Sequence, residues 1–199
     1  MAKLYFRYGP MNSGKSTLLM QVAHNYEERG MEVIVMKPSI DKKGDNEIVS
    51  RLGVRRKVDQ LIHPEANVFD LVHEAMKKKR PSCILVDEAQ FLSPIQVDQL
   101  FLLVLTDDIP VICYGLRTDF LARGFAGSKR LLELAHSLEE LKTICRCGRK
   151  AILNMRKING KPVFHGDQVA IDGEDRVEYE SVCGNCYLEE LKKSGIEIF

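Results

Sequence analysis

The chain has 199 residues, a formal net charge of +1 at pH 7, and 45% hydrophobic and 29% charged residues. This composition is ordinary for a globular protein, and the length suits one large domain or a medium domain with a small appendage. A near-neutral charge argues against a protein that depends on the phosphate backbone of nucleic acid. No apolar stretch reaches about 18 residues and the start of the chain lacks a signal-peptide apolar region, so we expect a cytoplasmic protein without a membrane span.

The first predicted elements are a strand over 3–8 and a helix over 15–29, joined by the loop GPMNSGKS at 9–16. The loop matches G-x-x-x-x-G-K-[ST] in its required context, although a glycine-rich turn that matches by chance is the alternative. Its backbone N–H groups and the helix N-terminus would cradle phosphates. Lys15 would reach the β- and γ-phosphates, and Ser16 would bind Mg²⁺. The expected nucleotide-binding residues here are Gly9, Pro10, Met11, Asn12, Ser13, Gly14, Lys15 and Ser16.

Strand and helix patterns then alternate. Gly30 is expected to end the first helix, 32–37 is a predicted strand, and the polar residues 38–59 are predicted to form a long flexible loop. Further elements are a helix that begins at Asn67 and ends in the basic run 77–80 before Pro81, a strand over 83–87, a helix from Ser93-Pro94 to Leu105 and a strand over 110–114. Continuous apolar strands that alternate with amphipathic helices indicate an α/β fold with a mostly parallel sheet.

The strand over 83–87 ends in Asp87, and Glu88, Ala89 and Gln90 follow. Asp87 fits a Walker B carboxylate that holds Mg²⁺. Glu88 is placed to accept a proton from an attacking oxygen, which belongs to water in an ATPase and to a substrate hydroxyl in a kinase. Spacing alone does not separate these two, and an acidic pair that caps the next helix is a third interpretation.

A loop with aromatic residues follows the strand over 110–114 and so begins at the carboxyl edge of the sheet, where ligands bind. It contains Leu116, Phe120 and Phe125 beside arginine and aspartate. Exposed phenylalanines of this kind would suit a flat aromatic substrate. A loop whose phenylalanines pack into the core is an equally good interpretation.

Near residue 141 the pattern changes to short strands, and we predict two domains, 1–140 and 141–199. The second has predicted strands over 151–158 and 162–165, with the hairpin signal Asn159-Gly160 between them. Two cysteine pairs flank this hairpin, at Cys145, Cys147, Cys183 and Cys186. Four thiolates in a reducing compartment favour a structural zinc ribbon, while free thiols or a redox pair are the alternatives.

Taken together, GPMNSGKS at 9–16, DEAQF at 87–91, GLRTDF at 115–120 and VCGNCY at 182–187 resemble the type II thymidine kinases. The resemblance covers essentially the whole chain, in order. It implies a RecA-like P-loop core with a small zinc-containing lasso domain. It also implies transfer of the ATP γ-phosphate to the 5′-hydroxyl of thymidine, and of deoxyuridine, in nucleotide salvage.

The resemblance also implies residue roles. Glu88 would be the general base, and Asp87, Glu88, Ala89 and Gln90 would join the loop at 9–16 in binding ATP. Residues implied to contact thymidine are Leu116, Phe120, Phe125, Asn154, Val169, Ala170, Ile171, Asp172, Gly173 and Tyr179. Members of the family are usually homotetramers that dTTP inhibits, so both properties are expected, with Mg²⁺ and structural zinc as metals.

Two positions depart from the family pattern. The spacing Cys145-x-Cys147 has one intervening residue in place of two. The segment after Ile40 lacks the arginine that meets the triphosphate in relatives, and Lys43 or Arg51 could replace it. The competing interpretations are a RecA-like ATPase that reads nucleic acid with its ribbon and a non-catalytic nucleotide-binding module.

Overall fold

The computed structural model describes residues 1–41, 44–168 and 176–196. Its centre is a parallel sheet of β5 (Gln60–Ile62), β2 (Val33–Pro38), β6 (Cys83–Val86), β7 (Val111–Gly115), β1 (Leu4–Tyr8) and β8 (Ser137–Glu140), in that spatial order. The predicted α/β class is confirmed. Because all six strands run the same way, the loops that follow β1, β6 and β7 meet at one edge of the sheet.

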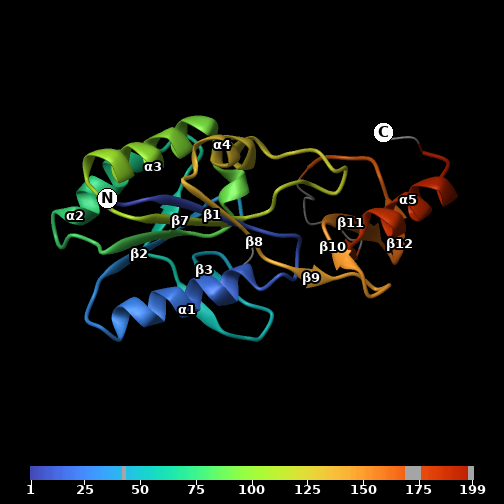
Figure 1. Cartoon of the computed structure of the whole chain (residues 1–199), viewed down its shortest axis with the longest axis horizontal. Helices are drawn as coiled ribbons and strands as arrows, with labels where there is room; N and C mark the ends of the chain where they lie inside the picture. Colours follow the sequence, from blue (N-terminus) through green and yellow to red (C-terminus); the bar gives the residue numbers. More distant parts are fainter. Residues whose placement is uncertain (42–43, 169–175, 197–199) are drawn as a thin grey trace.

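Helices cover both faces of this sheet. The helices α2 (Val68–Met76), α3 (Pro94–Thr106) and α4 (Ala126–Leu134) lie on one face, and α1 (Lys15–Glu27) lies on the other (Figure 1). Alternate strand residues point to opposite faces, so Ile34 and Met36 join the core under α2–α4, while Val33 and Val35 join the core under α1. The strands are therefore buried on both sides, as their continuous apolar sequences predict.

The predicted N-termini of two helices are confirmed, and in both a nearby side chain accepts a hydrogen bond from a backbone N–H group of the first turn. The Asn67 side chain accepts a hydrogen bond from the N–H of Asp70 at the start of α2. Ser93 and Gln96 form a reciprocal capping box at the start of α3, with Pro94 as its first residue. The α1 helix ends at Glu27, two residues earlier than predicted, and Gly30 follows at φ +70°.

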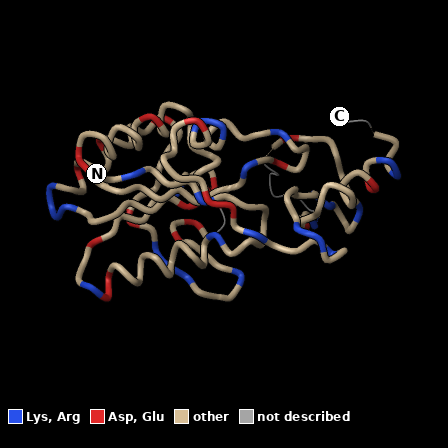
Figure 2. The backbone as a smooth tube through the Cα atoms, viewed as in Figure 1, with Lys and Arg blue, Asp and Glu red and all other residues tan. Residues whose placement is uncertain are grey.

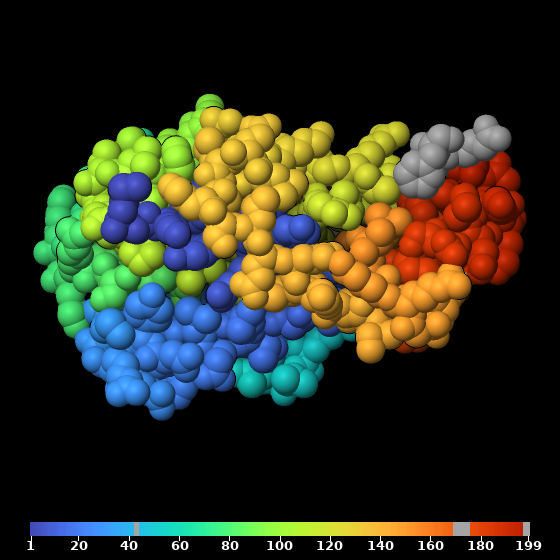
Figure 3. All heavy atoms as spheres, viewed as in Figure 1, coloured from blue at the N-terminus to red at the C-terminus, as the bar shows by residue number. Residues whose placement is uncertain are grey.

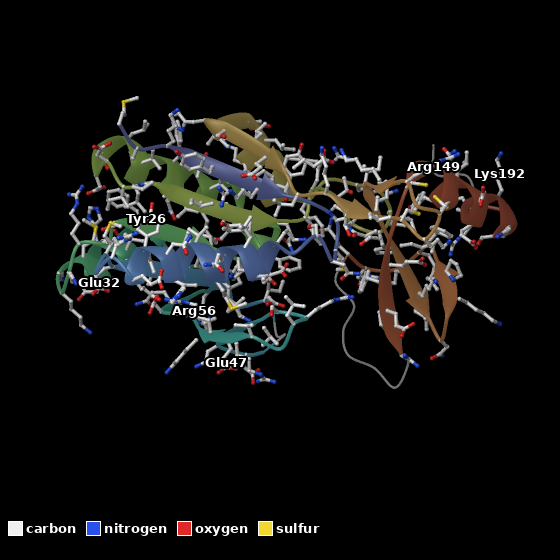
Figure 4. All side chains as sticks on the ribbon, turned by 60° about the horizontal axis from the view of Figure 1, so that its bottom comes forward. Tyr26, Glu32, Glu47, Arg56, Arg149 and Lys192 are labelled. Carbon is white, nitrogen blue, oxygen red and sulfur yellow. The ribbon has the colours of Figure 1, made fainter. Side chains whose placement is uncertain are left out.

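The prediction of a long flexible loop over 38–59 is wrong. This segment contains a hairpin of β3 (Glu47–Val49) and β4 (Arg55–Lys57). Ile48 is buried in the core beneath α1, and Arg56 makes a bidentate ion pair with Glu27 of that helix, at 2.6 and 3.0 Å. Figure 4 labels Arg56 and Glu47 on the two strands of this hairpin. Polar composition suggested a loop, but one buried isoleucine and one ion pair dock the hairpin on the helix.

The C-terminal part forms a small unit beside the carboxyl edge of the sheet (Figure 1, Figure 3). It contains β9 (Thr143–Ile144) paired with β10 (Lys150–Ala151), the sheet of β12 (Lys161–Val163), β11 (Leu153–Ile158) and β13 (Val177–Val182), and α5 (Gly184–Lys193). The predicted hairpin at Asn159-Gly160 is confirmed, with φ values of +50° and +79°. The predicted strand over 151–158 is interrupted between Ala151 and Leu153.

A third apolar core belongs to this unit. It includes Met155, Phe164, Tyr187 and three of the cysteines, and shares no residue with the two cores of the sheet. The boundary near residue 140 stays a prediction. The polar strand β8 and the helices α4 and α5 were not predicted from the sequence. None of the helices in the described residues has the length and apolar character needed to span a membrane.

Candidate active site at the carboxyl edge of the sheet

The loop at 9–16 connects β1 to α1 and follows the pattern of a phosphate-binding loop. Gly14 has φ +80° at the start of α1, and Asn12 has φ +64°. Gly9 is required for a different reason. A Cβ atom there would lie 2.5 Å from the Leu141 carbonyl oxygen and 2.6 Å from Ser13 Oγ. The N–H of Gly9 donates to the Gly115 carbonyl oxygen at 3.3 Å, which ties the loop to the end of β7.

Lys15 and Ser16 lie at the base of this loop. The Lys15 ammonium group donates to the carbonyl oxygens of Pro10 at 2.8 Å and Gly9 at 3.2 Å, so the cation is held within the loop. Ser16 Oγ donates to Asp87 Oδ2 at 2.9 Å. The two residues predicted to bind Mg²⁺ are thus brought together from α1 and the end of β6.

The second oxygen of Asp87 supports a cation at this position. Oδ1 is buried and has no hydrogen-bond partner among the described residues. Burial, and next the negative charge of Glu88, raises the pKa of Asp87 to about 7. A buried carboxylate oxygen without a donor is costly unless a cation neutralises it. Together with the Ser16 hydroxyl, this donor set fits the hard oxygen ligands that Mg²⁺ prefers.

Glu88 stands directly after Asp87 in a left-handed backbone conformation, with φ +48° and ψ +37°. Such a backbone conformation is uncommon outside glycine, and the Glu88 carboxylate is held in place by a neighbouring side chain. Gln90 fixes it, because its Nε2 donates to Glu88 Oε2 while its Oε1 accepts from the N–H of Leu116 at 3.0 Å. A Cβ at Gly115 would lie 2.8 Å from that Gln90 oxygen, so glycine leaves room for this bridge.

The predicted aromatic contacts are in the interior in this structure. Leu116, Phe120 and Phe125 are 5%, 1% and 4% exposed. Phe125 packs edge-on against Phe91 at 5.6 Å between ring centroids. The interpretation that the phenylalanines pack inside is therefore confirmed, while their contact with a substrate stays a prediction.

Asn154 joins the small unit to the phosphate loop. Its Oδ1 accepts from the N–H of Met11 at 2.7 Å, and its Nδ2 donates to the Thr118 carbonyl oxygen at 3.3 Å. Ser181 on the neighbouring strand donates through Oγ to the Met11 carbonyl oxygen. Both backbone groups of Met11 are thus held by β11 and β13. Sequence reasoning placed Asn154 only in relation to substrate and gave no signal for Ser181.

Arg156 was missed by sequence reasoning because it looked like one of many charged strand residues. It is only 4% exposed and lies with its guanidinium over the Phe120 ring, 3.6 Å from the ring centroid. Tyr179, a predicted site residue, accepts a hydrogen bond from Arg156 Nε at 3.0 Å through its hydroxyl. The predicted residues Val169, Ala170, Ile171, Asp172 and Gly173 lie outside the described residues, as does Lys43. Arg51 is exposed on the surface.

The four predicted cysteines come together. The Sγ atoms of Cys145, Cys147, Cys183 and Cys186 all lie within 4.8 Å of one another. A tetrahedral zinc site with Zn–S bonds of about 2.3 Å places its sulfurs about 3.8 Å apart, so the cluster is of the right size. Within the cluster, the Cys186 backbone N–H lowers the pKa of Cys183 to about 6, while the hydrogen bond with the Cys147 side chain raises the pKa of Cys186 to about 12. A thiolate is thus favoured at Cys183 before any metal binds. The one-residue spacing of the first pair does not prevent assembly of the cluster.

The fold and the site define a P-loop nucleotide-binding protein with an appended four-cysteine cluster. Comparison with known proteins narrows this class. The family model described as Thymidine kinase matches residues 2–187, and the chain belongs to this family. The resemblance noted from the motifs is confirmed.

Relatives named Thymidine kinase match over nearly their full length. The protein of Haemophilus influenzae is 50% identical over 95% of this chain and 97% of its own, and that of Shewanella oneidensis is 48% identical over 95% and 98%. The protein of Enterobacteria phage T4 is 45% identical over 98% and 100%. Among solved structures, a DNA replication initiation factor aligns with 71% of this chain and 40% of its own at 18% identity, with a TM-score of 0.40.

Proposed function

We propose that the protein transfers the γ-phosphate of ATP to the 5′-hydroxyl of thymidine, and also of deoxyuridine, giving the monophosphate for nucleotide salvage. The observation that carries the proposal is Glu88, which Gln90 orients beside the pair Ser16–Asp87 at the end of the phosphate loop. Membership of the thymidine kinase family supports a nucleoside hydroxyl, rather than water, as the attacking group.

Each group in the site has a defined role in this reaction. The backbone N–H groups of residues 9–16 bind the phosphates of ATP, together with the N-terminus of α1. Lys15 leaves the carbonyl oxygens of Gly9 and Pro10 and binds the β- and γ-phosphates. Ser16 and Asp87 would hold Mg²⁺, which would neutralise charge on the phosphates when bound. Glu88 accepts the proton of the nucleoside 5′-hydroxyl as the oxygen attacks the γ-phosphorus, the bond from that phosphorus to the β–γ bridging oxygen breaks, and ADP leaves.

The acceptor pocket is proposed on the side of the small unit. Leu116, Phe120 and Phe125 line the space for the thymine ring, and Asn154 lies near the thymine methyl group. The lasso, with Val169, Ala170, Ile171, Asp172 and Gly173, reads the base edge through its backbone, and Tyr179 helps to hold it. The Phe120 carbonyl oxygen accepts from the Tyr187 hydroxyl at 2.7 Å, which links this pocket to α5 and the cysteine cluster. Zinc held by the four cysteines of that cluster would stabilise the acceptor pocket.

We also propose that the protein is a cytoplasmic homotetramer inhibited by dTTP. The large apolar residues Ile95, Leu102 and Leu105 stand exposed along α3, and a groove of about 380 Å³ beside α1 is lined in part by Tyr5, Val22 and Ile112. Both surfaces suit contacts between copies. Sedimentation analysis would distinguish a tetramer from a monomer, and dTTP inhibition that thymidine relieves would support a shared pocket.

The interpretation as a nucleic-acid-dependent ATPase has weaker support. Figure 2 shows that basic and acidic residues both occur on the sheet domain and on the small unit, without a single basic stripe. The deciding experiment incubates the protein with ATP, Mg²⁺ and each natural nucleoside and measures ADP and nucleoside monophosphate. One monophosphate per ADP with thymidine and deoxyuridine would support the proposal. ADP without a phosphorylated nucleoside would refute it and favour the ATPase.

A further inference from the structure

Arg156 makes an unusual set of contacts for an arginine on a short strand. Its Nη2 donates to the carbonyl oxygens of Asp167 at 2.7 Å and Gln168 at 3.2 Å, in addition to the contact of Nε with Tyr179. The guanidinium lies over Phe120. No carboxylate in residues 1–41, 44–168 and 176–196 lies within 4.0 Å of its nitrogens. A buried cation is thus satisfied by two carbonyls, one hydroxyl and an aromatic ring.

These contacts connect three places in the chain that are far apart in sequence. Asp167 and Gln168 follow β12, Tyr179 lies within β13, and Phe120 belongs to the loop after β7. Only a planar group with several donors in fixed directions reaches all of them at once. Arg156 therefore fastens both flanks of residues 169–175 to the aromatic loop of the sheet domain.

Hydrogen bonds that do not involve Arg156 hold the backbone around Phe120. The effect of Arg156 is therefore on the orientation of the Phe120 ring. The Asp119 carboxylate accepts from the N–H groups of Leu121 at 2.9 Å and Arg123 at 2.8 Å, and the Phe120 carbonyl oxygen accepts from the Tyr187 hydroxyl at 2.7 Å. With the backbone fixed, the remaining freedom is rotation of the Phe120 side chain. A guanidinium 3.6 Å from the ring centroid restricts that rotation through packing and cation–π attraction.

We propose that Arg156 is a positioning residue for the nucleoside acceptor. It acts through Phe120, Asp167, Gln168 and Tyr179, which it holds in the arrangement that receives the base, and it does not touch the reacting atoms. The inference rests on the proposed thymidine pocket. Loss of Arg156 would therefore weaken thymidine binding while leaving the phosphate loop and Glu88 in place.

Lysine does not replace this residue, although it has the same charge. An ammonium group is a compact point charge that neither stacks flat on a ring nor donates in three fixed directions. Arg156→Lys thus removes the geometry and keeps the charge. Tyr179→Phe removes only one acceptor. Lys157→Gln is the matched control, because Lys157 is the next residue on the same strand and instead pairs with Glu180 at 2.6 Å.

The test measures kcat and KM for thymidine and for ATP in the wild type, Arg156→Lys, Tyr179→Phe and Lys157→Gln. For Arg156→Lys we expect the thymidine KM to rise about tenfold to a hundredfold, as for loss of charged hydrogen bonds, with kcat and the ATP KM within about threefold of wild type. Tyr179→Phe should show a smaller rise in the same constant, and Lys157→Gln none. Calorimetric titration with thymidine alone should show the largest loss of affinity for Arg156→Lys, a smaller loss for Tyr179→Phe and none for Lys157→Gln.

An unchanged thymidine KM in Arg156→Lys would overturn the inference, as would equal losses in the thymidine and ATP constants, which indicate a general structural role. Should the lysine variant fail to fold, Tyr179→Phe decides, since an unchanged thymidine KM there counts against the proposal. Failure of the proposed function is a different result, because the wild type would then form no thymidine monophosphate.

Discussion

Replacement of Glu88 by glutamine isolates the proposed proton acceptor. The substitution keeps the length of the side chain and its left-handed backbone, so it adds no new backbone strain at φ +48°. The new amide oxygen still accepts from Gln90 Nε2, as the carboxylate does now. We expect the free energy of unfolding to change by less than about 0.5 kcal/mol, as for a substitution that preserves packing and hydrogen bonds.

Turnover should respond very differently. A positioned general base contributes about 10²–10⁴-fold to rate, which corresponds to about 3–5 kcal/mol of activation free energy. We expect kcat for Glu88→Gln to fall by that factor. The thymidine KM should stay near the wild-type value, because the acceptor pocket, and not Glu88, binds the thymine ring. The Glu88 charge also helps to raise the pKa of Asp87, so its removal should lower the pKa of that carboxyl group.

The assay follows ADP and thymidine monophosphate under saturating ATP and thymidine, with Mg²⁺ varied in parallel. Thermal unfolding of the variant is the control for its fold. A kcat within about threefold of wild type would refute the role of Glu88 as the base. A large loss of Mg²⁺ affinity would instead assign Glu88 to the metal site.

Three other changes test separate parts of the structure. Gly127→Ala would place a Cβ 2.5 Å from the Leu92 carbonyl oxygen, so we expect a loss of about 1–3 kcal/mol in urea unfolding, whereas Gly184→Ala, with open space around it, should be neutral. Zinc removal by a chelator should raise the thymidine KM through Phe120 before the sheet domain unfolds; an unchanged KM in verified zinc-free protein would contradict this. Finally, the Asp87 pKa is raised from 3.8 to about 7, so between these values the folded protein holds a proton that the unfolded chain releases. Without nucleotide or metal, stability should fall as pH rises through this window and level off above about 7, and Asp87→Asn should flatten the slope relative to wild type.

The elements predicted well from sequence have local causes. Three of them depend on residues only a few positions apart: the phosphate loop, the Ser93–Gln96 capping box and the Asn159-Gly160 turn. The residue types at these short spacings predict the local conformation directly. The buried strands have continuous apolar sequences, which indicate a parallel sheet without reference to any partner. The four cysteines could be grouped because thiolate ligands for a metal form a small set of spacings.

The parts that were missed have distant causes. The hairpin over 47–57 is docked by Arg56 and Glu27, which lie 29 residues apart. Strand β8 is polar and is recruited by pairing with β1 across more than a hundred residues. No local pattern reports such contacts, because tertiary packing rather than propensity decides them.

The same division applies to the site. The sequence by itself determined the phosphate loop, the carboxylates Asp87 and Glu88, the cysteine cluster and the family, because each depends on residue types at short, fixed spacings. Only the tertiary structure decided that Asn154 and Ser181 hold Met11, and that Arg156 joins Phe120 to Tyr179. These are contacts between chain segments far apart in sequence, and their geometry exists only once the small unit packs against the edge of the sheet.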